Sequence, residues 1–195
     1  MARRLIVGLS GASGVIYGIR LLQVLHQRED IETHLVVSKP AERTIVEETN
    51  FKVDEVKALA SELHAIQNIG ASIASGSFKT EGMAVVPCSI RTASAIAHCI
   101  SDNLLTRAAD VALKERKRLV LVVRESPLHV GHLKSLLAAA EAGAVIVPPA
   151  PAFYSLPKTL DDIIDHTVGR VLDLFGIEHD LVRRWGENGP HADEA

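Results

Sequence analysis

The sequence has only two cysteines, no excess of charge of one sign, and no recognisable set of metal ligands. Cys88 and Cys99 form no C-x-x-C pair and have no histidine at a zinc spacing, so we expect both to be reduced and packed. The 21 Lys and Arg residues nearly balance the 24 Asp and Glu residues. Because the charges nearly balance, the chain has no strong net positive charge that would attract nucleic acid or an anionic membrane surface.

Long apolar runs are also missing. The apolar stretch behind Arg3 and Arg4 breaks at Gly8-Leu-Ser-Gly, which is too early for a signal peptide or a membrane span. We therefore expect a cytoplasmic chain that is not exported. With 195 residues, 47% of them apolar, the chain is long enough for a complete core. We predict one domain over residues 1–195, with a C-terminal tail from about residue 176.

The first twenty residues have the pattern strand, small-residue loop, helix. Leu5 to Leu9 is an apolar run, Ser10 to Gly14 is a tight turn, and Val15 begins a helical pattern. Backbone N–H groups at such a helix start bind an anion or a flat polar ring. The glycines do not spell G-x-G-x-x-G, and Ser38-Lys39 follows the second strand where a ribose-binding acid would stand, so NAD is disfavoured. A phosphate or flavin loop is favoured; alternatively, the small residues only permit close packing of helix on sheet.

The remaining chain alternates short apolar strands with helices. We predict strands at 32–38, 83–87, 119–123 and 144–147, and helices at 15–26, 40–48, 52–63, 89–99, 104–117, 128–142 and 159–175. The Ser/Gly-rich segment 70–82 is predicted to be a functional loop or mobile flap, and the proline-rich segment 148–157 to be extended. This alternation predicts an α/β fold with a parallel sheet, helices on both faces, and ligands at the carboxyl ends of the strands.

Hydroxyl and cationic side chains collect in the predicted loops and helices. The hydroxyls are those of Ser10, Ser13, Ser38, Ser89 and Thr92, and the cations are Arg107, Lys114, Arg124 and Arg170. The three arginines among these cations have mostly apolar neighbours in the sequence, which predicts that they are buried. A buried arginine needs an anion as a partner. Together they favour a phosphate ligand. The alternative is internal ion pairs, such as Arg124 with Glu125 or Lys114 with Asp110.

Two motifs are set aside. Tyr154-Ser-Leu-Pro-Lys158 fits the Y-x-x-x-K pattern of short-chain dehydrogenases, but Pro157 prevents the shared helix face that this motif needs. His129 and His132 lack a third ligand nearby and are interpreted as helix surface. No metal is predicted.

Several short stretches together match a known family. The most specific are Arg107-Ala-Ala-Asp-Val-Ala-Leu-Lys-Glu115 and Phe153-Tyr154. The others are Gly8-Leu-Ser-Gly-Ala-Ser-Gly14, Ser38-Lys39, Glu48-Thr49, Ser75-Gly-Ser77, Pro87-Cys-Ser89, Arg124-Glu125 and Arg184-Trp-Gly186. With these residues the chain resembles the UbiX/Pad family of flavin prenyltransferases, formerly regarded as aromatic-acid decarboxylases.

The resemblance implies a three-layer Rossmann-like or flavodoxin-like subunit that assembles as a homododecamer. It implies a metal-independent transferase that joins the dimethylallyl group of dimethylallyl phosphate to reduced FMN. The product, prenylated FMN, would serve a UbiD-type decarboxylase.

The resemblance also assigns roles to individual residues. Those expected to hold FMN are Gly11, Ala12, Ser13, Ser38, Ser89, Ile90, Arg91, Thr92 and Arg124, with Arg107 close by. Those expected to hold dimethylallyl phosphate are Lys114, Arg124, Tyr154 and Arg170, with Trp185 shaping the pocket. Ser13 and Glu48 are expected to assist proton movements, and Lys114 to act on the leaving phosphate.

Three rival functions remain open at this point. A flavin-dependent cysteine decarboxylase would share the nucleotide loop, but it carries a Pro-x-Met-Asn motif, and the only methionines here are Met1 and Met83. A non-catalytic FMN carrier subunit would return the flavin unchanged. Direct decarboxylation of an aromatic acid would release CO2 without a partner protein.

Overall fold

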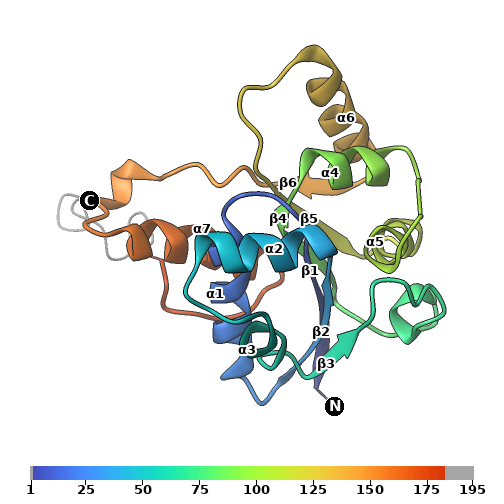
Figure 1. Ribbon diagram of the computed structural model, residues 1–195, viewed down its shortest axis with the longest axis horizontal. Coiled ribbons are helices and arrows are strands. Elements are labelled where there is room, and N and C mark those ends of the chain that lie inside the picture. The colour runs from blue at the N-terminus through green and yellow to red at the C-terminus, as the bar shows by residue number, and fades with distance from the viewer. Residues whose placement is uncertain (1, 183–195) are drawn as a thin grey trace.

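The centre of the fold is a parallel sheet, seen edge-on in Figure 1. The computed structural model describes residues 2–182. Within them the sheet has six strands in the order β3-β2-β1-β4-β5-β6, and every neighbouring pair is parallel. The strands are β1 (Arg3–Leu9), β2 (Ile31–Val37), β3 (Glu62–His64), β4 (Gly82–Cys88), β5 (Arg118–Val123) and β6 (Ala144–Ile146).

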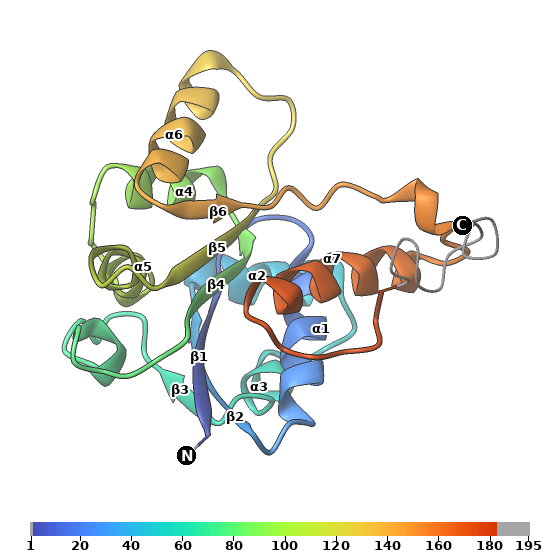
Figure 2. The same ribbon diagram turned by 180° about the vertical axis from the view of Figure 1, so that it is seen from behind.

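Helices cover both faces of this sheet, which confirms the predicted three-layer α/β fold (Figures 1 and 2). On one face lie α1 (Val15–His26), α2 (Lys39–Glu48), α3 (Val53–Lys57) and α7 (Leu160–Leu174). On the other lie α4 (Ile90–Ala97), α5 (Leu104–Lys114), α6 (Val130–Glu141) and the 3₁₀ turn Ser72–Ala74. Alternate strand residues supply the two cores: Leu5 and Val7 of β1 face the first group, whereas Ile6 faces the second.

The strand order reverses between β1 and β4. The chain moves outward from β1 to β2 and β3, then returns to place β4 on the other side of β1. In an open parallel sheet, ligands bind outside the carboxyl ends of the strands at such a switch point. The loop after β1, residues 10–14, and the loop after β4 therefore stand at the expected ligand-binding edge.

One local prediction is wrong. The predicted helix over residues 52–63 is a single short helix, α3, followed by the edge strand β3. The Ser/Gly-rich segment 70–82, predicted to be a functional loop or mobile flap, packs on the sheet face, with Ile73 and Ala74 buried. Lys117 Nζ donates to Phe78 O at 2.8 Å and fastens the same segment to the end of α5.

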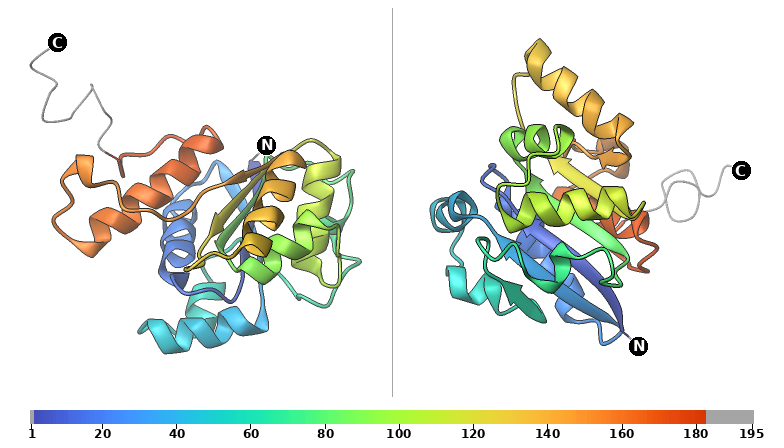
Figure 3. Two further views of the ribbon diagram at one scale, coloured as in Figure 1. Left: turned by 90° about the horizontal axis from the view of Figure 1, so that it is seen from above. Right: turned by 90° about the vertical axis from the view of Figure 1, so that its right-hand side faces the viewer.

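The C-terminal part of the described chain runs along α1. The segment after β6 is extended as predicted, apart from one 3₁₀ turn at Phe153–Ser155, and it reaches away from the sheet before α7 returns (Figure 3). Thr159 caps α7, and Arg20 of α1 holds Asp165 of α7 with two hydrogen bonds of 2.6 and 3.1 Å. Between residues 2 and 182 no helix combines the length and the apolar character that a membrane span requires.

Candidate functional site

The loop after β1 is fixed to the loops after β2 and β4. Ser10 is 1% exposed; its Oγ donates to Pro87 O at 3.0 Å and accepts from Ser89 N at 2.7 Å. On the other side, Ser38 N donates to Leu9 O at 2.9 Å. The buried Ser10 side chain thus links the loop after β1 to the loop after β4 by hydrogen bonds, and it is not available to contact a ligand.

Two glycines give this loop its shape. A Cβ on Gly11 would lie 2.2 Å from Pro40 Cβ, so the loop packs against the first turn of α2 more closely than any side chain allows. Gly14 has φ +91°, the left-handed region that other residues rarely adopt. Close packing is therefore one real function of these small residues, as the alternative interpretation of the sequence held.

A carboxylate lies at the start of α1. Glu48, the last residue of α2, accepts from Gly14 N at 2.8 Å and from Val15 N at 3.4 Å. A negative charge is stabilised there by the helix dipole and by N–H groups that lack partners within the helix. Beside it, Ser13 is exposed and makes no hydrogen bond within residues 2–182. The edge thus combines a positioned carboxylate with a hydroxyl that is available to a ligand.

The helices α2 and α4 also begin at this edge. Ser38 caps α2 by accepting from Ala41 N at 3.2 Å, and Ser89 caps α4 by accepting from Thr92 N at 3.2 Å. Ser89 Oγ additionally donates to Thr92 Oγ1 at 3.0 Å. Three helix N-termini therefore face one edge, where their dipoles favour an anion. The other predicted flavin contacts in these loops are Ala12, which is buried, Ile90, which is half-buried, and Arg91, whose side chain is exposed.

The predicted burial is wrong for Arg124 and Arg170, which are exposed, whereas Arg107 is half-buried. Arg124 follows β5 and is exposed, although its backbone N donates to Cys88 O at 3.1 Å and holds it next to the loop after β4. Arg107 pairs with Asp110 and Arg170 with Asp173, each at 2.9 Å and each three residues along a helix. Internal ion pairs, the alternative interpretation, therefore account for Arg107 and Arg170.

Lys114 lies far from the loop after β1. It is the last residue of α5, which ends just before β5 begins, and so it stands at the amino edge of the sheet. Its partner is Glu115 rather than Asp110, and its Nζ lies against Gly76. Within one chain the structure does not bring Lys114 to Ser13 or Glu48.

Tyr154 and Arg170 belong to a second group, formed by the 3₁₀ turn Phe153–Ser155 and by α7. Tyr154 Oη lies 3.1 Å from His166 Nε2, and the two rings meet edge to face. Burial lowers the pKa of His166, and the positive charge of Arg170, one turn further along α7, lowers it too. Sequence reasoning missed His166, although its position four residues before Arg170 in a predicted helix placed both on one face. Trp185 lies outside the described residues.

The cysteines stay unpaired, as predicted, but only one is packed. Cys88 is buried at the end of β4, where burial raises the pKa of its thiol. Cys99 is exposed in the turn after α4, with φ +56°. Neither thiol contacts the exposed Ser13 or Glu48, so the site offers no cysteine nucleophile.

Comparison with known proteins decides the family. Residues 1–172 match the family model described as Flavoprotein. Flavin prenyltransferase UbiX of Salmonella typhimurium is 60% identical over 185 residues, which cover 94% of this chain and 98% of that protein. The chain belongs to the UbiX family of flavin prenyltransferases. The UbiX protein of Archaeoglobus fulgidus is 52% identical and matches over 94% of this chain and 100% of its own length.

Solved UbiX structures share the fold. AnUbiX (PadA1) in complex with FMN and dimethylallyl pyrophosphate superposes with a TM-score of 0.92 at 49% identity, covering 95% of this chain and 98% of its own. A dodecameric FMN-dependent UbiX-like decarboxylase of Escherichia coli O157:H7 gives 0.91 at 50% identity, with 93% and 98% covered. The peptidyl-cysteine decarboxylase EpiD, at 19% identity and a TM-score of 0.63, shares only the fold.

Proposed function

We propose that this chain transfers a dimethylallyl group from dimethylallyl phosphate to N5 and C6 of reduced FMN, making prenylated FMN. The observation that carries the proposal is the edge where α1, α2 and α4 begin, with the exposed Ser13 beside the carboxylate of Glu48. A UbiX family member needs an anion-binding edge for the flavin and a positioned acid or base for its protons. This edge supplies both.

The residues at this edge fit a bound flavin nucleotide. Gly11 has no side chain and lies against Pro40, so the loop stays close to the first turn of α2. A flat ring could therefore approach the loop backbone there. Ser13 is free to donate, and Arg124 is an exposed cation without an ion pair within residues 2–182. The proposed FMN contacts are Gly11, Ala12, Ser13, Ser38, Ser89, Ile90, Arg91, Thr92 and Arg124, with Arg107 nearby.

The cationic residues act on the leaving phosphate. When an allylic carbon–oxygen bond breaks, negative charge grows on the phosphate, and cations already fixed in place stabilise it. Lys114, Arg124 and Arg170 would supply this charge, and the Tyr154 hydroxyl a hydrogen bond. Reduced FMN, when bound, supplies the nucleophilic N5 and C6 and an electron-rich ring face. Glu48, held at the start of α1, is placed to move protons at that ring, and Ser13 to relay them.

A complete site requires more than one copy of the chain. Lys114 stands at the edge opposite to Glu48, and Tyr154 and Arg170 lie in the turn before α7 and on α7; this separation supports a site that several chains build together. Exposed apolar side chains offer contact surfaces for further copies: Val130, Leu133 and Leu137 share one face of α6, and Phe153, Leu156 and Leu160 precede or begin α7. We propose a homododecamer, the state named for the E. coli relative, in which neighbouring copies supply Lys114, Tyr154 and Arg170.

The chain would act as a supplier of a modified flavin. The product, prenylated FMN, carries a new ring and is not used further in this site. We propose that a UbiD-type decarboxylase uses it as a cofactor. Two unpaired cysteines fit the reducing cytoplasm, where we place the protein. We also propose that residues 1–195 form one domain, because the sheet and both helical layers share continuous cores.

Anaerobic incubation with reduced FMN and dimethylallyl phosphate, followed by mass analysis of the released flavin, tests the activity. The shared site is tested separately by coexpressing the Glu48→Gln and Lys114→Ala chains, each inactive alone. Random mixing leaves about a quarter of the sites with both native residues, so about a quarter of the activity should return. No recovery would mean that both residues act from the same chain.

A further inference from the structure

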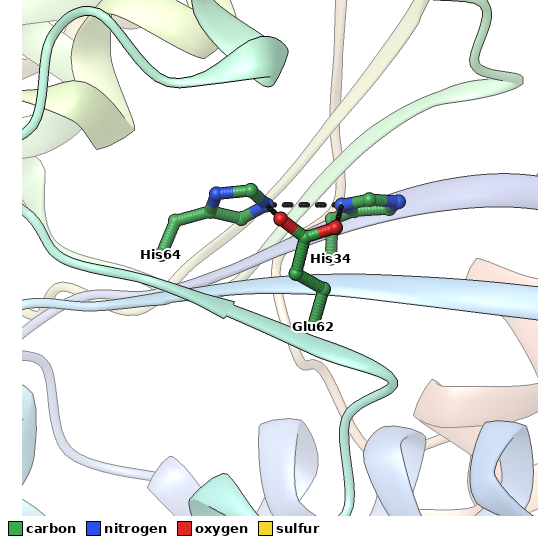
Figure 4. Close-up of side chains that lie close together, drawn as sticks. All are labelled: His34, Glu62 and His64. Atoms are coloured by element: carbon green, nitrogen blue, oxygen red, sulfur yellow. Dashed lines mark hydrogen bonds and ion pairs between the residues drawn. The ribbon is translucent and has the colours of Figure 1, made fainter.

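Two histidines and a glutamate meet on the sheet, away from the proposed prenylation site (Figure 4). His34 Nδ1 and His64 Nε2 are 2.9 Å apart. Glu62 reaches each ring with a different carboxylate oxygen: Oε2 lies 3.4 Å from His34 Nδ1, and Oε1 lies 3.5 Å from His64 Nε2. With one ligand atom taken from each residue, the three atoms lie within 4.8 Å of one another.

Parallel pairing of β2 with β3 creates this cluster. His34 is paired in register with Glu62, and Val36 with His64, so all three polar side chains project from the same sheet face. Segment 70–82 covers that face: Phe78 meets the His34 ring edge to face, with centroids 4.9 Å apart. His34 is 1% and His64 7% exposed, whereas the Glu62 side chain is 51% exposed.

A second layer of charged groups orients His34. Its Nε2 points away from the cluster and lies 3.2 Å from Glu32 Oε1, an ion-pair distance without the alignment of a standard hydrogen bond. Arg4 Nε in turn donates to Glu32 Oε2 at 2.9 Å, and the Arg4 guanidinium stacks over the Phe78 ring at 5.0 Å. A carboxylate behind the outer nitrogen of a histidine is the usual support of a metal-ligating imidazole, because it fixes the ring and raises its basicity.

We propose that His34, His64 and Glu62 bind a divalent transition metal ion of the zinc class. Two imidazoles and one carboxylate are a donor set that zinc accepts, with water as the fourth ligand. Ligand atoms at the usual distance from tetrahedral zinc lie about 3.3–3.5 Å apart. Each carboxylate oxygen lies at about this spacing from one of the two nitrogens, and the nitrogen–nitrogen contact of 2.9 Å requires a small parting of the rings to admit the ion.

The contact between the two rings also fits a metal. His34 Nδ1 and His64 Nε2 lie within hydrogen-bond distance, so one of these nitrogens donates and the other accepts with a lone pair that a metal could use. A metal takes the place of the proton that the two rings share, and this proton leaves to solvent. The Glu62 side chain is 51% exposed, so the cluster is open to solvent on the side of that carboxylate, and a surface pocket of about 330 Å³ lies against His64.

This site would be structural and would not take part in prenyl transfer. β3 has three residues and stands at the edge of the sheet, so its pairing with β2 is weakly held. A metal bound across β2 and β3 would fasten that edge strand. It would also support the position of Ser38, which directly follows β2 at the ligand-binding edge.

The test is zinc binding to the full-length, untagged protein, measured by competition with a coloured chelator and by the visible spectrum of the Co²⁺ form. We expect one ion per chain, a tetrahedral Co²⁺ spectrum, and a rise in Tm of about 5–10 °C at a hundredfold excess of Zn²⁺ over its Kd. His64→Gln should weaken binding at least about a hundredfold, and Glu32→Gln, which leaves the three ligands in place, about 10- to 100-fold.

Two further variants keep the test decisive. Glu62→Gln alters a largely exposed side chain, so it should fold normally and still lose the zinc-dependent rise in Tm. His98→Gln changes an exposed histidine at the end of α4 and should bind zinc as the native chain does. Absence of binding to the native chain, or equal affinity of the native, His64→Gln and Glu62→Gln chains, would overturn the proposal.

Discussion

Replacing Gly11 by alanine tests how the flavin loop is built. The added Cβ would lie 2.2 Å from Pro40 Cβ and 3.2 Å from the Pro40 carbonyl carbon, where ordinary contacts begin at about 3.4 Å. Since the nearest atoms belong to a ring and to backbone, neither can turn aside as a flexible side chain would. The loop after β1 or the first turn of α2 must therefore move.

The expected cost is that of overpacking a well-filled site, about 1–3 kcal/mol. For a chain of this length, that cost corresponds to a fall in Tm of about 2–12 °C. Displacing the loop should also weaken FMN binding, by about tenfold for each 1.4 kcal/mol that the displacement costs. Thermal denaturation and a fluorescence titration with FMN measure the two effects.

A matched control and a rescue accompany this variant. Gly70→Ala adds the same methyl group where the nearest atom, Asn68 Oδ1, is 3.6 Å away, and should change Tm little. Removing the Pro40 Cβ in Gly11→Ala/Pro40→Gly should recover part of the loss, which a double-mutant cycle reports as a coupling energy of about 0.5–3 kcal/mol. If Gly11→Ala is no more harmful than Gly70→Ala, or if the cycle shows no coupling, the contact does not shape the loop.

Three further changes probe neighbouring parts of the structure. Glu48→Gln should lower product formation by about 10²–10⁴-fold but leave FMN bound, measured by single-turnover assay and flavin titration; unchanged turnover would remove Glu48 from proton transfer. Ser10→Ala leaves the N–H of Ser89 without its acceptor, so the free energy of unfolding, measured with urea, should fall by about 1–3 kcal/mol. An unchanged free energy of unfolding would show that the Ser10 hydrogen bonds do not stabilise these loops. Hydrogen bonds from the backbone of Lys158 and Thr159 lower the pKa of Asp162 below its ordinary value of 3.8. Its stabilising effect is therefore present above about pH 4 and lost as pH falls through the lowered pKa. The Tm difference between the native chain and Asp162→Asn should vanish on acidification, and a constant difference would contradict this account.

The sequence patterns predicted the strand-to-helix loops at the carboxyl edge of the sheet well because local rules determine them. Small residues after a buried strand, and serine at the start of the next helices, are strong local signals for strand-to-helix loops. The structure places Ser10 and Ser89 in those loops, hydrogen-bonded to each other. What the pattern could not separate was the role of each serine, since only packing shows that Ser10 is buried and Ser13 exposed.

The edge strand was missed because three residues carry too little periodicity. Its one apolar residue, Leu63, continues the helical spacing of α3, so the pattern predicts one helix over residues 52–63. That error also hid the histidine cluster, since His34 and His64 are thirty residues apart and meet only when β3 pairs with β2.

The positions of the cations depend on how whole helices are oriented. Arg170 stands among apolar residues in sequence, but helical spacing puts Val168, Val171 and Leu172 inward and Arg170 outward. Lys114 is at the end of a helix that returns to the amino edge, so no local pattern shows that it is remote from Glu48. Only the assembled sheet shows that these charges lie away from Glu48 within one chain, which is why we propose that another copy supplies them.

The mass of the flavin after an anaerobic reaction tests the central claim most directly. The purified protein is incubated with reduced FMN and dimethylallyl phosphate, and the flavin is then released and weighed against a sample without protein. We predict a flavin heavier by one five-carbon unit, formed only when protein and both substrates are present. FMN that stays bound but unchanged in mass would contradict prenyl transfer and would indicate a flavin carrier or a cysteine decarboxylase.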